Sequence, residues 1–302
     1  MRVVDLFSGC GGLSLGFENA GFDVVAAYDN WQPAIAVHKA NFTHPLFNVN
    51  LSDETIAVKH ISEYQPNMII GGPPCQDFSS AGKRDENNGR GDLTISYAKI
   101  ISALKPSWFV MENVSTITKS TKLAVARDMF KQSGYGLTQI VLNAALCGVP
   151  QRRKRFIMIG HLGEQDDFML ETIKSRVSNK EMTVKDYFGE HIDVEYYYRH
   201  PRSYARRGIF SVNEPSPTIR GVNRPIPDGY KIHSNDPIQS LAGVRPLTTK
   251  ERSMLHTFPE NFISVGGKSD LEQMIGNAVP VKLGELIASA INSYILTKQE
   301  LH

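Results

Sequence analysis

One cysteine of the sequence stands in a setting that suits chemistry. Cys75 lies in the stretch GGPPCQDFSS, where two prolines stiffen the backbone just before it and limit where the thiol can point. The chain has three cysteines, Cys10, Cys75 and Cys147, with no CxxC pair and no Cys/His cluster. An odd, scattered set argues against a disulfide framework and against a zinc site. Cys75 is therefore either a nucleophile or a packed structural thiol.

A second candidate is Glu112, which opens the tripeptide Glu-Asn-Val after the apolar run 108–111. A carboxyl group at the end of such a run is expected to be partly buried, and burial raises its pKa. A buried acid beside a thiol suits covalent attack on a base whose ring nitrogen must be protonated or hydrogen-bonded at the same time. Alone, Glu112 would be read as a salt-bridge partner, but the two residues together favour catalysis.

A glycine-rich turn near the N-terminus could hold a cofactor. In DLFSGCGGLS (residues 5–14) the glycines allow a tight turn from strand to helix and a close approach of a ligand to the backbone. As a dinucleotide fingerprint it is imperfect, because Ser14 stands in the third position. Asp29 follows about 20 residues later, where a carboxylate can accept hydrogen bonds from ribose hydroxyls. The pattern indicates either an adenosine-type cofactor, NAD or S-adenosylmethionine, or a purely structural turn.

These residues need a scaffold that brings them together. Short apolar runs alternate with helical spacing in the first half of the chain, which predicts a parallel sheet covered by helices on both faces. The expected strands are 2–7, 23–28, 68–71, 108–112, 137–143 and 155–160, and the expected helices are 12–20, 31–41, 97–104 and 122–133. Phe7, Cys75 and Glu112 follow or end three of these strands. Because ligands bind outside the carboxyl ends of strands in such sheets, we expect these residues in one crevice.

The second half of the chain has a different character. From about residue 165 prolines and glycines interrupt it often, and no long helical spacing returns before 281–297, which predicts a smaller, irregular domain. Residues 281–297 carry one apolar stripe, and this helix is expected to pack back on the first domain. We expect a catalytic and cofactor-binding domain of residues 1–165, completed by 270–302, and a second domain of residues 166–269.

Charge is distributed unevenly along the chain. The formal net charge is +2, yet residues 196–225 hold six arginines and one acid, Glu214. The arginines are Arg199, Arg202, Arg206, Arg207, Arg220 and Arg224. This segment indicates an anionic partner, nucleic acid foremost, although a solvated arginine-rich loop would have the same composition. An ordinary hydrophobic fraction of 41%, and Asp5 so early in the sequence, predict a cytoplasmic protein without a membrane segment.

The motifs occur in the order found in one family. The chain resembles the DNA (cytosine-5) methyltransferases, enzymes that use S-adenosylmethionine and are common in bacterial restriction–modification systems. The matching pieces are DLFSGCGG (5–12), GGPPCQDFS (71–79), ENV (112–114), QRRKR (151–155), RPLTTKER (245–252), FPENF (258–262) and GNAVP (276–280). The resemblance implies an α/β, Rossmann-like methyltransferase domain with a smaller, irregular target-recognition domain. It also implies double-stranded DNA as the partner, a monomer, no metal site, and protection of host DNA.

The resemblance implies a role for each catalytic residue. Cys75 would attack C6 of the target cytosine as a thiolate, and Glu112 would bond the N3 edge and donate a proton there. C5 would then take the methyl group, a base would remove the C5 proton, and Cys75 would leave by elimination. Arg153 and Arg155 would bind the flipped base and nearby phosphates, with a solvated basic turn as the alternative. The cytosine must leave the helix, because its ring cannot be reached in the stack.

The resemblance also implies a cofactor site. The residues that would surround the cofactor are Phe7, Gly9, Cys10, Gly11, Gly12, Asp29, Asn30, Asn50, Pro74, Leu93, Asn277, Ala278 and Val279. Two positions depart from the family pattern. Asn30 stands where many members have an aromatic residue, with Trp31 one place later, and Asn50 stands where an acid is expected near the adenine amino group. Cys147 lies in no family motif and is expected to be a packed core thiol.

DNA contacts are implied for two regions. Residues 76–95, including Gln76 and Ser79, match the loop that closes over DNA. The recognition region lies between QRRKR and RPLTTKER and contains the arginine-rich segment, together with Thr218, which resembles a threonine near the flipped base. Arginine reads guanine through O6 and N7. We expect some of the six arginines to contact guanine and others to contact phosphate.

Three other classes of protein compete with this interpretation. The tRNA-methylating branch of the family carries a Cys-Phe-Thr tripeptide in its recognition region, and this sequence has none. Catalytically silent DNA-binding relatives usually lose Pro-Cys or Glu-Asn-Val, and both are intact here. An NAD oxidoreductase would have no use for Cys75, Glu112 and the arginine-rich segment together.

Overall fold

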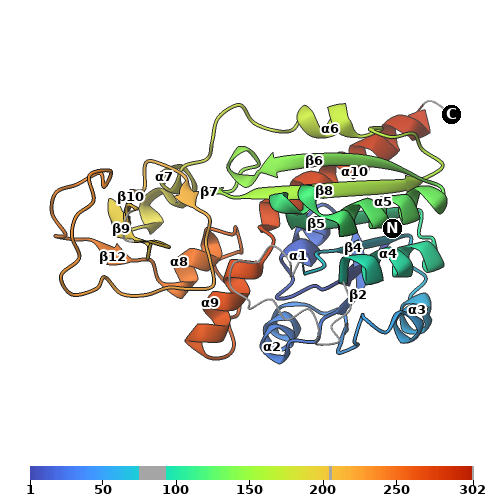
Figure 1. Ribbon diagram of the computed structural model, residues 1–302, viewed down its shortest axis with the longest axis horizontal. Helices are drawn as coiled ribbons and strands as arrows, with labels where there is room; N and C mark the ends of the chain where they lie inside the picture. Colours follow the sequence, from blue (N-terminus) through green and yellow to red (C-terminus); the bar gives the residue numbers. More distant parts are fainter. Residues whose placement is uncertain (75–92, 204–205, 301–302) are drawn as a thin grey trace.

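The computed structural model describes residues 1–74, 93–203 and 206–300. Its centre is a seven-stranded sheet with the strand order β3-β2-β1-β4-β5-β8-β6 (Figure 1). The strands are β1 (Arg2–Leu6), β2 (Asp23–Tyr28), β3 (Leu46–Phe47), β4 (Met68–Gly71), β5 (Trp108–Val114), β6 (Tyr135–Asn143) and β8 (Lys154–Leu162). Strands β1 to β5 are parallel. The direction of strand order reverses between β1 and β4, and a crevice for a ligand is expected at their carboxyl ends.

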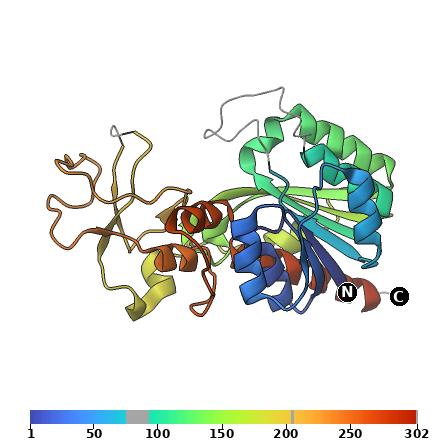
Figure 2. The same cartoon turned by 90° about the horizontal axis from the view of Figure 1, so that it is seen from below.

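Helices cover both faces of this sheet (Figures 1 and 2), as expected for a parallel arrangement with apolar strands. On one face, α1 (Gly12–Asn19) and α10 (Val281–Glu300) pack on the sheet. On the other face lie α3 (Glu54–Ser62), α4 (Leu93–Leu104) and α5 (Thr121–Gln132). Helix α2 (Gln32–Asn41) covers the end of the sheet near β3 and packs on Cys10 and Phe258. The expected Rossmann-like α/β class is confirmed.

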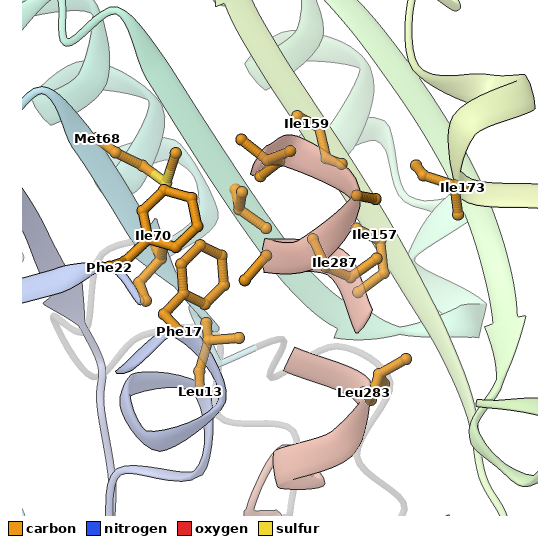
Figure 3. Close-up of a cluster of buried hydrophobic side chains, with 14 of the residues drawn as sticks. Leu13, Phe17, Phe22, Met68, Ile70, Ile157, Ile159, Ile173, Leu283 and Ile287 are labelled. Atoms are coloured by element: carbon orange, nitrogen blue, oxygen red, sulfur yellow. The ribbon is translucent and has the colours of Figure 1, made fainter. Parts of the chain in front are cut away.

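The C-terminal helix is part of the main hydrophobic core. Figure 3 shows Leu13 and Phe17 of α1 on one side of α10, with Leu283 on its other side and Ile287 close to Ile157 of the sheet. The expectation that this helix packs back on the first part of the chain is confirmed. The stretch Lys268–Gln299 has the length and apolar composition of a membrane span, but 56% of its apolar window is buried. It also consists of two helices, α9 (Lys268–Asn277) and α10.

Strand β8 corrects the expectation of a wholly parallel sheet. It runs antiparallel to both of its neighbours, β5 and β6. Parallel neighbours need a long crossover, usually a helix, and residues 144–153 contain only a 3₁₀ turn, Ala144–Leu146, and the short strand β7 (Gln151–Arg152). Consequently β8 starts at the edge where β5 ends, and Arg155 pairs with Val114.

Residues 165–280 contain helices in addition to the expected short strands and loops, and three of the four are only five or six residues long. Helices α6 (Leu170–Lys174), α7 (Val184–Phe188), α8 (Thr249–Met254) and α9 occur there. The start of α8 was readable from the sequence, because Thr248 and Glu251 form a capping box. Helix α9 is mostly polar and buries only three side chains, so its apolar stripe is weak.

A second, smaller sheet lies beside the large one, with α8 and α9 between them (Figure 1). Its central strand β9 (Tyr196–Tyr198) is flanked by β10 (Ile209–Ser211) and β12 (Arg245–Pro246). The long connection before β12 is tied down by buried Asp236, whose carboxylate accepts hydrogen bonds from Gly208, Ile209, His233 and Tyr230. Strand β11 (Ser216–Pro217) pairs with β7 in a separate two-stranded sheet and so links this part to the segment just before β8.

Candidate functional site

Glu112 and Arg155 form an ion pair at the carboxyl edge of the large sheet. The Nε atom of Arg155 lies 2.8 Å from Oε1 of Glu112, and their side chains are only 12% and 9% exposed. Burial raises the pKa of Glu112, while the charges of Arg155 and Arg153 oppose that rise. The expected burial of Glu112 is confirmed. Such an acid keeps a proton at a higher pH than an exposed glutamate does, and the guanidinium fixes its orientation.

The segment that leads into Cys75 runs alongside this ion pair. A Cβ atom on Gly72 would lie 3.1 Å from Oε2 of Glu112, so that oxygen faces the segment 72–74. Buried Asn113 donates a hydrogen bond of 2.8 Å from Nδ2 to the carbonyl oxygen of Pro73. Asn113 belongs to the ENV motif, but its contact with Pro73 could not be read from the sequence. The residues that follow Pro74, including the predicted Cys75, Gln76 and Ser79, lie outside the described residues.

Asn113→Ala is expected to lower both stability and turnover. It leaves the Pro73 carbonyl without its donor, and an unsatisfied buried carbonyl costs about 1–3 kcal/mol. Because the segment before Cys75 loses its attachment to β5, we also expect kcat to fall roughly tenfold, the equivalent of about 1.4 kcal/mol. Urea denaturation and single-turnover methylation measure the two effects. Exposed Asn213→Ala is the control, and unchanged stability and turnover in Asn113→Ala would exclude this role.

Arg153 lies in a different environment from Arg155, although both belong to QRRKR. Its guanidinium is buried and donates hydrogen bonds to the carbonyl oxygens of Ile219 at 3.2 Å, Gly276 at 2.9 Å and Ala278 at 3.0 Å. Burial is the main reason why its pKa is lowered. Arg153 therefore holds two segments of backbone, at residue 219 and at residues 276–278. Its side chain is only 1% exposed, so it is not accessible to phosphate.

The glycine-rich turn is built around Asp29. Its two carboxylate oxygens accept hydrogen bonds of 2.8 Å from the backbone N–H groups of Gly9 and Trp31. Phe7 has a φ of 58°, which is uncommon for a residue other than glycine, and Gly9 and Gly11 also have positive φ. Strained backbone of this kind is concentrated at functional sites. The turn holds Asp29 partly exposed beside Gly9.

The surroundings of the turn fit an adenosyl cofactor at Gly9. A Cβ atom on Gly12 would lie 2.2 Å from the carbonyl oxygen of Val279, and one on Gly11 would lie 2.3 Å from Phe42. Gly9, by contrast, has no atom within 4 Å of that position. The open side of the turn thus lies at Gly9, next to a carboxylate that suits ribose hydroxyls, and the residues present fit the cofactor.

Gly12→Ala is expected to weaken cofactor binding about 10- to 100-fold. The added methyl group must displace the backbone at Val279, and overpacking of this kind costs roughly 1–3 kcal/mol. Calorimetric titration with S-adenosylmethionine measures the change in Kd. Gly267→Ala is the matched control, because its nearest atom would be 3.9 Å away. Equal affinity for S-adenosylmethionine in Gly12→Ala and the wild type would contradict the expectation that the packing of Gly12 on Val279 shapes the cofactor site.

The other predicted cofactor residues lie in mixed environments. Asn30 is exposed, whereas Trp31 packs in the cluster of Cys10 and Phe258. Asn50 is exposed, and its Oδ1 accepts hydrogen bonds from the N–H and hydroxyl of Ser52. The exposed and half-buried positions that remain are Pro74, Leu93, Asn277, Ala278 and Val279. Leu93 is the first residue of α4, and Asn277 is the last of α9.

Neither described cysteine is suited to nucleophilic attack. Cys10 and Cys147 are both buried, and burial raises the pKa of each thiol to about 12. The thiolate is the reactive form, so both groups are almost entirely inert at neutral pH. Cys147 lies in the core between the sheet and α10, which confirms the expectation of a packed thiol.

The six arginines of the recognition region fall into two groups. Arg199 donates to the carbonyl of Thr218 at 2.6 Å, Arg207 pairs with Glu214 at 2.5 Å, and Arg220 donates to the carbonyl of His200. Arg207 also lies 4.2 Å from the centre of the Phe210 ring. Each of these three guanidiniums therefore has a structural partner. Arg202, Arg206 and Arg224 are exposed.

Thr218 and Gln151 join the recognition region to β7, just before β8. The hydroxyl of Thr218 donates to the carbonyl of Arg152 at 2.7 Å. Buried Gln151 accepts a hydrogen bond from the N–H of Ile219 at 2.9 Å and donates to the carbonyl of Leu255 at 3.2 Å. Gln151 begins the QRRKR motif, and its contacts could not be read from the sequence because both partners lie more than 60 residues away.

Comparison with known proteins agrees with this site. Residues 1–293 match the family "C-5 cytosine-specific DNA methylase". The chain is 58% identical over 295 residues to the Type II methyltransferase M.HindV of Haemophilus influenzae, covering 97% of each protein. It is 54% identical over 295 residues to the Type II methyltransferase M.HgiDI of Herpetosiphon aurantiacus, covering 98% of this chain and 95% of that protein.

Among solved structures, the S. pombe Dnmt2 methyltransferase superimposes with a TM-score of 0.72 at 16% identity, covering 97% of this chain and 98% of that one. At this identity the likeness supports the fold alone. The match over nearly the whole chain, together with relatives above 50% identity, establishes the family. The protein is thus a member of the C-5 cytosine-specific DNA methylases, which transfer a methyl group from S-adenosylmethionine to C5 of cytosine in DNA.

Proposed function

We propose that the protein methylates a cytosine rotated out of duplex DNA at a specific sequence, and that it is the modifying enzyme of a restriction–modification system. The observation that carries the proposal is the buried Glu112–Arg155 pair beside the segment that leads into Cys75. The Type II names of the relatives from Haemophilus influenzae and Herpetosiphon aurantiacus support the biological role.

In the proposed reaction, the thiolate of Cys75 forms a bond to C6 of cytosine. Glu112 gives its proton to N3, so that charge does not accumulate on the ring as C6 is attacked. The bound cofactor supplies an electrophilic methyl group, which C5 accepts. A base then removes the C5 proton, the electrons of that bond reform the C5–C6 double bond, and Cys75 leaves as a thiolate. The proton on N3 returns to Glu112 in the same elimination, which restores both the base and the acid.

The two oxygens of Glu112 have different roles in this proposal. Oε1 contacts Arg155, whereas Oε2 faces the segment 72–74. We assign the proton transfer to Oε2, because it lies on the side from which Cys75 follows. Arg155 positions the carboxyl group, and its charge keeps the pKa of Glu112 from rising further. We assign Arg153 to holding backbone rather than to binding phosphate, since its described partners are three carbonyls.

We further propose that the two sheets have different functions. The large sheet with α10 would bind the cofactor and perform catalysis, and the small sheet would recognise DNA. Met169 and Ile173 are buried in the core of the large sheet, which supports a boundary after α6 rather than at residue 165. The exposed side chains of Arg202, Arg206 and Arg224 are assigned to DNA, where arginine can read guanine or hold phosphate.

A methyl-transfer assay tests the proposal. The protein is incubated with tritiated S-adenosylmethionine and either duplex DNA or tRNA. We expect label in DNA and none in tRNA, and bisulfite sequencing of a methylated plasmid should map modified cytosines to one short sequence. Label in tRNA alone would overturn the proposal in favour of RNA methylation. Light scattering during size-exclusion chromatography tests the accompanying proposal of a monomer.

A further inference from the structure

A buried ion pair lies beneath the turn 220–223 of the small sheet's region and away from the site described above. Arg252 of α8 and Glu272 of α9 have side chains that are 5% and 4% exposed, and Nη1 lies 2.5 Å from Oε2. Removing two charges from water is costly, and apolar replacements of similar volume are often as stable. A buried ion pair in this position is therefore better explained by the backbone that it positions than by a gain in stability.

Both members of the pair bind the same turn. Arg252 donates from Nη2 to the carbonyl oxygen of Arg220. Glu272 accepts at Oε1 from the side-chain amide of Asn223 at 3.0 Å and from the hydroxyl of Thr249 at 2.8 Å. The first and last residues of the turn are thus fixed by opposite charges that are themselves paired, so the turn has a defined position relative to α8 and α9.

The turn also lies directly on α9. A Cβ atom on Gly221 would be 2.3 Å from Oε1 of Gln273, and one on Gly276 would be 2.3 Å from the backbone nitrogen of Gly221. The guanidinium of Arg220 extends the connection to the carbonyl of His200. Exposed Arg224 follows the turn and exposed Arg202 follows His200, so the network lies between two arginines assigned to DNA.

We propose that Arg252 and Glu272 are positioning residues for DNA specificity, which hold the turn 220–223 so that Arg224 and Arg202 meet DNA in a fixed register. The inference rests on the proposed recognition role of the small sheet. It assigns the pair to discrimination between sequences rather than to cofactor binding or the chemical step, because neither side chain contacts Glu112 or the glycine-rich turn.

The test replaces the pair and measures discrimination. In Arg252→Met/Glu272→Met, bisulfite sequencing compares methylation at the mapped sequence with methylation at sites differing by one base pair. We expect discrimination to fall about tenfold or more, the scale of one misplaced base contact, with the Kd for S-adenosylmethionine unchanged. Lys250→Met/Glu260→Met is the matched control, because it removes an exposed pair 2.8 Å apart that also begins on α8.

If the double variant does not fold, Arg252→Lys is used for the same measurement of discrimination. Lysine keeps a charge opposite Glu272, but a single ammonium lacks the planar fork that also reaches the Arg220 carbonyl, so we expect a smaller loss of discrimination. Wild-type discrimination in folded Arg252→Lys and, where it folds, in the double variant would overturn the inference. A wild-type protein that methylates many unrelated sequences would instead overturn the proposed recognition function.

Discussion

The variant Glu112→Gln is expected to lower kcat by about 10²–10⁴-fold, because its amide can hydrogen-bond N3 of cytosine but cannot give it a proton. The Kd values for DNA and S-adenosylmethionine should change little, since Glu112 lies apart from the glycine-rich turn. Single-turnover methylation with saturating DNA measures the chemical step. Glu181→Gln is the matched control, because it makes the same change in an exposed Arg–Glu pair, with Arg152 at 2.6 Å. Equal rates for Glu112→Gln and the control would contradict the proposed proton transfer.

The pH dependence of the methylation rate is a second test of the role of Glu112. Burial raises the pKa of Glu112, so the protonated form persists above its ordinary range and is lost as the pH rises through the raised value. The wild-type rate should therefore decline on the alkaline side, and this limb should be missing in Glu112→Gln. Arg155→Met removes a charge that lowers this pKa, so its alkaline limb should move to higher pH, although its rate is reduced.

The variant Cys75→Ser should abolish turnover while leaving DNA binding intact. A serine hydroxyl is not ionised near neutral pH and cannot replace the thiolate that attacks C6. Methyl transfer below the detection limit, with a Kd for DNA within about twofold of the wild type, is the expected result; twofold is roughly 0.4 kcal/mol. Gel-shift titration and tritium incorporation measure the two quantities.

Cys147→Ser is the control for that substitution. Cys147 is buried in the core, where its sulfur lies 3.5 Å from the carbonyl of Asn143, and serine is the replacement nearest to it in size and shape. We expect it to retain turnover at near wild-type rates. If Cys75→Ser still methylates DNA and Cys147→Ser does not, the nucleophile has been assigned to the wrong cysteine.

Much of the scaffold could be predicted from local patterns. The apolar runs that became β1, β2, β4 and β5 alternate with helical spacing, and a parallel sheet is the ordinary result of that alternation. Burial of Glu112 followed from its place at the end of such a run. The position of Asp29 directly after β2 likewise placed its carboxylate beside the glycine-rich turn, where both oxygens accept backbone hydrogen bonds.

The direction of β8 and the contacts of Arg153 could not be predicted from local patterns. Strand direction depends on whether the connection 144–153 can cross the sheet, and an apolar strand looks the same in either direction. Arg153 and Arg155 are two positions apart in one basic motif, yet Arg155 meets Glu112 while Arg153 meets carbonyls of residues 219, 276 and 278. Only the three-dimensional arrangement brings those distant segments to Arg153.

Covalent trapping tests most directly whether Cys75 is the nucleophile. A duplex with 5-fluorocytosine at the mapped position can accept the thiolate at C6 and the methyl group at C5, but fluorine cannot leave as the proton does. The enzyme should remain attached to DNA in the presence of S-adenosylmethionine, and mass spectrometry of the digest should place the adduct on the peptide that contains Cys75. No adduct, or an adduct on Cys10 or Cys147, would contradict the mechanism.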